Sequence, residues 1–322
     1  DVYKRQLFGL VIFGQGNKSL GTIVAISSYA SYFWQPIMNL GNIFNNFINN
    51  IAYLERIFET IDEPVTVKDA EHAIKMPKIR GKVTFDHVTF AYDETKTILK
   101  DVSFTVNPGE SVALVGPTGA GKSTIVNLIS RFYNVNDGKV LIDDQDIADV
   151  TIHSLRAQMG IMMQDSFIFS GTIADNIRYG KLDATQEEIE KAGKIVCADP
   201  FIREMPKGYE TQVRERGSML SQGQKQLISF ARTLLCDPAI LILDEATSSI
   251  DVQTEKALQT GLNRMLKGRT SFIIAHRLST IRGCDKIMYI DDGGIAEAGT
   301  HEELMKKKGR YYKLYTAQKS LH

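Results

Sequence analysis

The stretch that decides the fold begins at residue 116 and reads Gly116-Pro117-Thr118-Gly119-Ala120-Gly121-Lys122-Ser123-Thr124. An apolar run, 111–115, precedes it and predicts a buried strand, and residues 125–129 follow with the composition of a helix. In this order, glycines let backbone N–H groups converge on a di- or triphosphate at a helix start. The ammonium of Lys122 then reaches the terminal phosphates, and the hydroxyl of Ser123 is available to Mg²⁺. A glycine-rich turn without a ligand is the alternative, which the strand and helix disfavour. We therefore expect all nine residues to bind a nucleotide.

The length of 322 residues allows one large globular domain with an appendage, or two domains. Its 38 basic and 38 acidic residues balance, so no net field attracts nucleic acid or an anionic surface. The three cysteines, Cys197, Cys236 and Cys284, lack metal-type spacing and are expected to be reduced core thiols. The basic run 306–313 follows two glutamates and predicts a solvated terminal helix rather than a nucleic-acid site.

A long uncharged segment near the N-terminus, 20–54, is long enough to cross a bilayer as a helix. Its second half places an amide-rich stripe opposite an apolar one, at helical spacing. At membrane depth such a polar stripe normally faces other helices or a water-filled path. A soluble amphipathic helix in a bundle is the alternative. We expect residues 1–62 to be the end of a transmembrane domain (a truncated helix, a turn and the last transmembrane helix), without a signal peptide, and 63–77 to be a polar linker.

The pattern changes to alternating and then to continuous apolar runs in the remaining residues, 78–322. Residues 83–90 are interpreted as a strand pair and 102–106 as a further strand. Five continuous apolar runs alternate with helical segments and indicate a parallel sheet buried on both faces: 140–143, 161–164, 240–245, 271–276 and 286–290. The segment 166–218 lacks such runs and predicts an inserted helical subdomain. The predicted fold class is an α/β phosphate-loop ATPase core with an antiparallel β-subdomain and an inserted α-helical subdomain, preceded by a transmembrane helical segment.

Polar side chains end three of these runs: Gln164, the pair Asp244-Glu245, and His276. In open parallel sheets ligands bind beyond the carboxyl ends of the strands, where the phosphate loop also lies. Asp244 is expected to hold the metal shell. Glu245, one residue further, is placed to polarise a water in line with the γ-phosphate.

Taken together, these motifs resemble the ATP-binding cassette (ABC) transporters of the exporter type, over nearly the whole chain. By this resemblance the loop is Walker A, 240–245 is Walker B with the catalytic glutamate, and Gln164 belongs to the Q-loop that also meets the metal. The resemblance further implies that His276 contacts the γ-phosphate, that Tyr92 stacks on adenine and that Asp251 belongs to the D-loop. Residues 211–217 resemble the exporter-specific loop that touches the membrane domain.

The family's signature motif is matched by Leu220-Ser221-Gln222-Gly223-Gln224. Because a strongly helical stretch, Gln224 to Leu235, follows, we expect the backbone and hydroxyl groups of Ser221 and Gly223 to form a second anion site at a helix start. The resemblance implies that Gln224 also belongs to the nucleotide-binding motif. The resemblance implies that two cassettes dimerise head-to-tail, each ATP lying between one phosphate loop and the other chain's signature. Gln222 stands where the family usually has glycine, as in heterodimeric exporters with one impaired site, so a heterodimer is favoured over a homodimer.

The sequence therefore predicts an ATP-hydrolysing subunit of an exporter, with ATP and Mg²⁺ as cofactors and Glu245, His276, Gln164 and Lys122 as catalytic residues. Its expected partners are a second half-transporter, membrane lipid and a small amphiphilic substrate, without nucleic acid. The expected location is the cytoplasmic membrane, multi-pass in the full-length protein, with the cassette in the cytoplasm. The alternatives are a soluble cassette ATPase acting on nucleic acid or ribosomes, and a regulatory binder that holds ATP without turnover.

Overall fold

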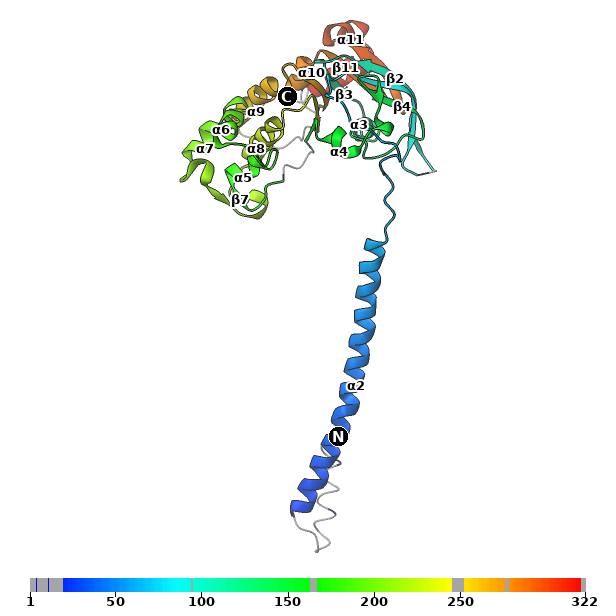
Figure 1. Cartoon of the computed structure of the whole chain (residues 1–322), viewed down its shortest axis with the longest axis vertical. Helices are drawn as coiled ribbons and strands as arrows, with labels where there is room; N and C mark the ends of the chain where they lie inside the picture. The colour runs from blue at the N-terminus through cyan, green and yellow to red at the C-terminus, as the bar shows by residue number, and fades with distance from the viewer. Residues whose placement is uncertain are drawn as a thin grey trace. The chain divides into compact units, whose positions relative to one another are not determined.

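The computed structural model describes Lys4, Val11 and residues 20–93, 95–162, 167–244, 252–275 and 278–319. The chain divides into two compact units between Val65 and Thr66. The described part of the first unit is dominated by one helix of 42 residues, α2 (Leu20–Ile61), drawn in blue in Figure 1, with Pro36 inside it. In the described residues no helix has both the length and the apolar character needed to cross a membrane.

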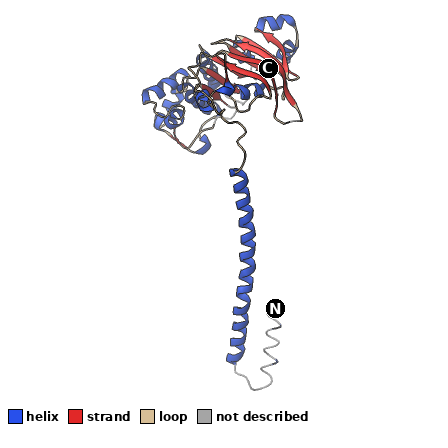
Figure 2. Cartoon of the chain, turned by 45° about the vertical axis from the view of Figure 1, so that its right-hand side comes forward, coloured by secondary structure: helices blue, strands red, loops and turns tan. Residues whose placement is uncertain are grey.

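The second unit is built around a mixed sheet of six strands in the order β12-β11-β3-β10-β9-β6. Pairing is parallel from β11 through β6, and only β12 runs antiparallel to its neighbour. The strands, in red in Figure 2, are β3 (Ser111–Val115), β6 (Met159–Met162), β9 (Ile240–Asp244), β10 (Thr270–Ile274), β11 (Lys286–Asp291) and β12 (Gly294–Gly299).

Both faces of this sheet are buried, as the continuous apolar runs predicted. Along β3, Val112 and Leu114 enter one hydrophobic core, whereas Ala113 and Val115 enter the other. Successive side chains of a strand point to opposite faces, so an uninterrupted apolar run fits a strand covered on both sides. The two cores hold β3 between two layers and fix the position of the loop that follows it.

One covering layer is a four-stranded antiparallel sheet in the order β2-β1-β4-β5. Its strands are β1 (Val83–Ala91), β2 (Thr97–Val106), β4 (Asp137–Ile142) and β5 (Gln145–Asp146). The placement of 140–143 in the parallel sheet was wrong, because β4 pairs antiparallel with β1 and β5. Asp143 and Asp144 have φ of 48° and 67°, the left-handed backbone of a tight hairpin turn, and this turn returns the chain as an antiparallel neighbour.

The interpretation of 83–90 as a strand pair was also wrong. Residues 83–91 form the single strand β1, whose pairing with β2 shifts register between Phe85 and Val88. His87 lies in this interval with φ of 50°. An extra residue of this kind interrupts the apolar alternation without ending the strand.

The other covering layer is helical and includes the predicted insertion. Figure 1 shows α5–α9 gathered at one end of this unit, away from the antiparallel sheet. The insertion comprises β7 (Gly171–Thr172), α5 (Ile173–Arg178), α6 (Gln186–Ile195), α7 (Asp199–Glu204), η2 (Gly208–Glu210), β8 (Gln212–Val213) and η3 (Glu215–Gly217), and α8 (Gln222–Leu235) follows it. The remaining helices are α3 (Lys122–Ile129), η1 (Ile147–Asp149), α4 (Ile152–Arg156), α9 (Val252–Leu266), α10 (Leu278–Gly283), α11 (His301–Lys307) and α12 (Arg310–Lys319).

Much of the stretch predicted as a polar linker packs on the cassette. Met76 is buried, and its N–H donates to Ser154 Oγ at 2.8 Å. Further along, the side-chain amide of Gln158 accepts from the N–H of Ile79 at 2.9 Å and donates to the carbonyl of Pro77 at 2.9 Å. Residues 68–79, which we call the strap, are therefore fastened to the cassette next to α4.

Arg131, just after α3, holds the start of this strap. Arg131 is 3% exposed, and its guanidinium donates to the carbonyls of Val150 at 2.6 Å and Lys68 at 3.0 Å. Arg156 in turn donates to the carbonyls of Ser130 and Arg131, which lie at the end of α3. The strap is thus tied to the far end of the helix that begins at the phosphate loop.

Candidate nucleotide site

The phosphate loop joins β3 to α3, and its shape depends on glycines with left-handed backbone. Gly116, Gly119 and Gly121 have φ of 141°, 80° and 107°. A Cβ on Gly121 would lie 2.8 Å from Leu99 Cδ2, whereas a Cβ on Gly119 would meet nothing within 4 Å. Pro117, Thr118 and Gly119 are exposed. The loop is therefore packed at its two ends and open at its middle, where a ligand can approach the backbone.

Lys122, the first residue of α3, is held inside this loop. Its Nζ donates to the carbonyls of Gly116 at 2.9 Å and Pro117 at 2.8 Å. Burial lowers the pKa of the Lys122 ammonium, and the carboxylate of Asp244 at the end of β9 raises it in part. The ammonium thus lies at the helix start, together with the positive end of the α3 dipole, where both favour an anion.

The opposite side of the loop rests against β11. A Cβ on Gly116 would lie 3.2 Å from the carbonyl carbon of Ile290 and closer still to its oxygen. The β11–β12 turn that follows Ile290 is anchored to β2, because Lys100 N–H donates to Gly293 O at 2.9 Å and Lys100 Nζ to Asp292 Oδ1 at 2.8 Å. These contacts fix the strand end on which the loop rests.

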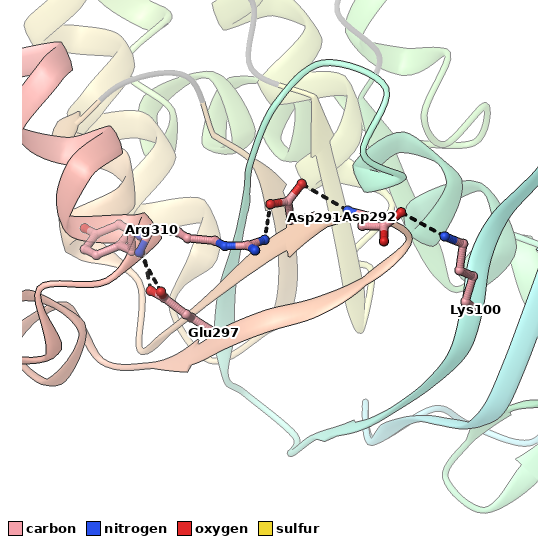
Figure 3. Close-up of polar contacts among 6 residues, drawn as sticks. Lys100, Asp291, Asp292, Glu297 and Arg310 are labelled. Atoms are coloured by element: carbon pink, nitrogen blue, oxygen red, sulfur yellow. Dashed lines mark hydrogen bonds and ion pairs between the residues drawn. The ribbon is translucent and has the colours of Figure 1, made fainter.

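The start of α12 is bonded to the end of β11 and to β12, on either side of this turn, as Figure 3 shows. The guanidinium of Arg310 pairs with Asp291, and the N–H groups of Arg310 and Tyr311 donate to the carboxylate of Glu297 at 2.6 and 3.1 Å. The predicted terminal helix is in fact two helices, and Tyr311 is buried. Sequence reasoning found no role for these residues, because nothing in the local pattern signals a contact across the sheet.

Tyr92 lies just after β1, beside α3. Its ring contacts Phe90 and Tyr133 edge-on, with 4.9 Å between ring centroids in both pairs. Its hydroxyl lies 3.2 Å from Thr124 Oγ1 and accepts from Asn127 Nδ2 at 3.4 Å. The ring is 47% exposed and offers a flat apolar surface. Sequence reasoning missed Tyr133 and Asn127, which carry no motif of their own.

The signature residues form a helix start, as predicted. Ser221 is the N-cap of α8: its hydroxyl accepts from the N–H of Gln224 at 3.2 Å, and the side chain of Gln224 accepts from the N–H of Ser221 at 3.0 Å. Gln222, two residues before the predicted start at Gln224, is the first helical residue and is exposed, whereas Gly223 is buried. The chain therefore presents two helix starts suited to anions, at α3 and α8.

Four predicted site residues lie outside the described part of the chain: Gln164, Glu245, Asp251 and His276. The structure does describe the strands that lead to three of them. Met162 pairs with Leu243, and Asp244 with Ile274, so β6, β9 and β10 end side by side at one edge of the sheet. This edge is the carboxyl end of parallel strands, where ligands bind in open sheets.

These features define a class of protein: a nucleotide-binding domain in which a phosphate loop lies at the carboxyl edge of a doubly covered sheet. Residues 99–248 match the family model described as ABC transporter. These residues therefore carry an ABC transporter domain, and similarity to ABC transporter ATP-binding proteins extends along nearly the whole chain.

The similarity to individual proteins extends well beyond the residues that the family model matches. The chain is 49% identical to the uncharacterized ABC transporter ATP-binding protein YknV of Bacillus subtilis, over 97% of this chain and 52% of that protein. It is 44% identical to a fatty acid ABC transporter ATP-binding/permease protein of Mycobacterium tuberculosis, over 94% of this chain and 48% of that protein. A bacterial Atm1-family ABC exporter with ATP bound superposes with a TM-score of 0.77 and 41% identity, over 93% of this chain and 52% of that one.

The chain thus spans about half the length of the curated relatives that it matches. The predicted α/β core with an antiparallel β-subdomain and an inserted helical subdomain is confirmed by the two sheets and the helical layer, and the similar proteins are ABC transporter ATP-binding proteins and exporters. The alternative of a soluble ATPase acting on nucleic acid is not supported by these relatives.

Proposed function

We propose that this protein hydrolyses ATP and couples hydrolysis to the export of a substrate across the cytoplasmic membrane. The observation that carries the proposal is the phosphate loop, in which Lys122 is held at the start of α3 by the carbonyls of Gly116 and Pro117. Within this proposal Glu245 activates the attacking water. His276 contacts the γ-phosphate, and Gln164 contacts the metal ion beside it. The neighbouring ends of β6, β9 and β10 support these three roles.

The side chains near the phosphate loop suit Mg²⁺ only when a bound nucleotide supplies further ligands. In the described part of the chain no three His, Cys, Asp or Glu side chains gather as a metal cage. Mg²⁺ is usually held by one or two protein groups together with phosphate oxygens and water. The exposed hydroxyl of Ser123, the carboxylate of Asp244 and the amide of Gln164 fit such a shared site. Bound there, the ion would neutralise charge on the phosphates.

The start of α8 supports a partner cassette. Ser221 and Gln222 are exposed at a helix N-terminus that is separate from the phosphate loop. We propose that this helix start serves the nucleotide of a second half-transporter. Gln222 takes the place of a small residue there, which favours a heterodimer with unequal sites. If its side chain crowds that nucleotide, Gln222→Gly will raise turnover in the assembled pair, and unchanged turnover will contradict the crowding.

An exposed aromatic cluster on the helical subdomain suits contact with a membrane domain. Phe167, Phe169 and Tyr179 touch one another, with ring centroids 4.9 and 4.6 Å apart. The guanidinium of Arg232 lies over two of these rings and donates to Phe167 O at 3.0 Å. Aromatic surface of this kind, backed by an anchored arginine, is typical of interfaces. The exporter-like loop 211–217 packs beside it, because Arg216 N–H donates to Ile168 O.

The substrate and the membrane location are proposed from the relatives and from α2. Similar proteins are named as a putative multidrug exporter and a fatty acid transporter, so we propose a small amphiphilic substrate. We propose that α2 belongs to a multi-pass membrane domain, with the cassette in the cytoplasm.

The test is ATP turnover by the protein paired with a matching subunit, with Glu245→Gln against a control, Glu302→Gln, on exposed α11. Loss of a general base lowers a rate by about 10²–10⁴-fold, so we expect a fall in this range with ATP binding retained. The control should match the wild type. Unchanged turnover in Glu245→Gln would remove that residue's role, and a wild-type pair that neither binds nor hydrolyses ATP would refute the function.

A further inference from the structure

The surface on which the base of the nucleotide would stack is tied to the helix that carries the phosphate-binding lysine. Tyr92 follows β1, whereas Thr124 and Asn127 belong to α3 and follow Lys122 by two and five residues. The Tyr92 hydroxyl meets both of these side chains, at 3.2 and 3.4 Å. One rigid element therefore holds both the base platform and the phosphate site.

The anchor on α3 is itself firmly placed. Thr124 is 4% exposed, and its neighbours Ile125 and Leu128 are fully buried in the core between the sheets. Asn127 is half-buried, and its backbone carbonyl accepts from the N–H of Phe132 at 2.9 Å. By contrast, Tyr92 lies in a bend just beyond the last ladder pair of β1, between Ala91 and Thr97. Its backbone alone does not fix the ring.

Two edge-on rings restrict the tilt of Tyr92 without restricting its distance from the loop. Phe90 and Tyr133 meet it at 86° and 85°. Edge-to-face contacts are favourable but weak, and they tolerate sliding. The hydroxyl contacts act along the ring axis and supply the missing restraint.

We propose that Asn127 is a positioning residue for nucleotide binding: with Thr124 it holds the Tyr92 hydroxyl and so sets the spacing between base platform and phosphate loop. This inference rests on the proposed function, because it concerns the same nucleotide site. A platform held before binding loses less conformational freedom when the base docks, and this strengthens binding. The phosphates alone do not use the platform, so their affinity is independent of the anchor.

The experiment compares ATP with tripolyphosphate, which lacks base and ribose, on the 322-residue chain in detergent. Immobilising one side chain on binding costs a factor of about two to ten in affinity. We expect Tyr92→Phe to raise the Kd for ATP by this factor and to leave the Kd for tripolyphosphate unchanged. In the pair with a matching subunit, the same change should raise KM with kcat constant. Tyr312→Phe on α12 is the matched control and should behave as wild type.

The variant Asn127→Leu shows whether Asn127 acts by positioning Tyr92 or only by stabilising the fold. In the wild-type background it should weaken ATP binding, and in the Tyr92→Phe background it should have no further effect, because the hydroxyl it holds is gone. Wild-type ATP affinity in Tyr92→Phe, or an Asn127→Leu loss that persists without the hydroxyl, would overturn the inference alone. A wild-type chain that binds neither ATP nor tripolyphosphate would overturn the proposed function as well.

Discussion

Replacing Gly116 by alanine tests whether contact with β11 shapes the phosphate loop. At φ of 141°, the backbone of Gly116 lies in a sparsely populated region that costs an L residue about 1–3 kcal/mol. The new Cβ would also lie 3.2 Å from the carbonyl carbon of Ile290 and closer to its oxygen, so backbone must move. Overpacking of this kind costs about 1–3 kcal/mol. We therefore expect the free energy of unfolding to fall by roughly 2–6 kcal/mol.

Alanine substitutions at two other glycines show how much of the effect comes from backbone strain, how much from the collision with Ile290 and how much from lost nucleotide binding. Gly109, in the turn before β3, and Gly119, in the loop, have φ of 81° and 80°, and neither would bring a Cβ within 4 Å of another group. Alanine at either site should cost only the strain, about 1–2 kcal/mol. Gly109→Ala should leave ATP affinity unchanged, whereas Gly119→Ala should weaken it by reorienting loop N–H groups.

The assay is urea unfolding followed by circular dichroism, together with the Kd for a fluorescent ATP analogue. If Gly116→Ala unfolds with the same free energy as Gly109→Ala, the contact with Ile290 does not shape the loop.

Three further predictions concern single side chains. Lys122→Ala should weaken ATP binding measured by calorimetry, because a half-buried cation leaves the helix start; unaltered affinity would contradict the loop assignment. Arg131→Met should lower the free energy of unfolding by roughly 2–4 kcal/mol, since two carbonyls lose their donors, whereas exposed Arg80→Met should change it little; equal urea midpoints would contradict the latching of the strap. The exposed pair with Asp101 raises the pKa of His87, so its contribution to stability is full below the unfolded pKa and is lost as pH rises through the folded value. Asp101→Asn should shift the NMR titration of His87 to lower pH, and an unchanged midpoint would show that the pair does not form in solution.

Local sequence was sufficient where neighbouring residues decide the structure. The phosphate loop is contiguous, and its glycines, lysine and flanking apolar runs predict strand, turn and helix without reference to the rest of the chain. The same holds for the capped start of α8, where Ser221 and Gln224 satisfy each other's backbone N–H groups. The roles of Gln164, Glu245, Asp251 and His276 stay predictions.

Pairing between distant segments could not be predicted in the same way. The apolar run of β4 suits either kind of sheet, and its pairing with β1, more than 50 residues earlier in the chain, decides which one it joins. Residues 63–77 are polar enough for a linker, yet buried Arg131, more than 50 positions away, holds Lys68.

The sequence by itself determined that a phosphate loop follows a buried strand and opens a helix, because backbone freedom and apolar periodicity are local properties. Only the tertiary structure decided what surrounds that loop and its helix: Ile290 against Gly116, Asn127 at the hydroxyl of Tyr92, and the strap bonded to Arg131 after α3. These contacts join residues that are far apart in the chain, and side-chain packing decides which of them meet. No short-range sequence pattern encodes which surfaces come together when two sheets and a helical layer enclose two hydrophobic cores.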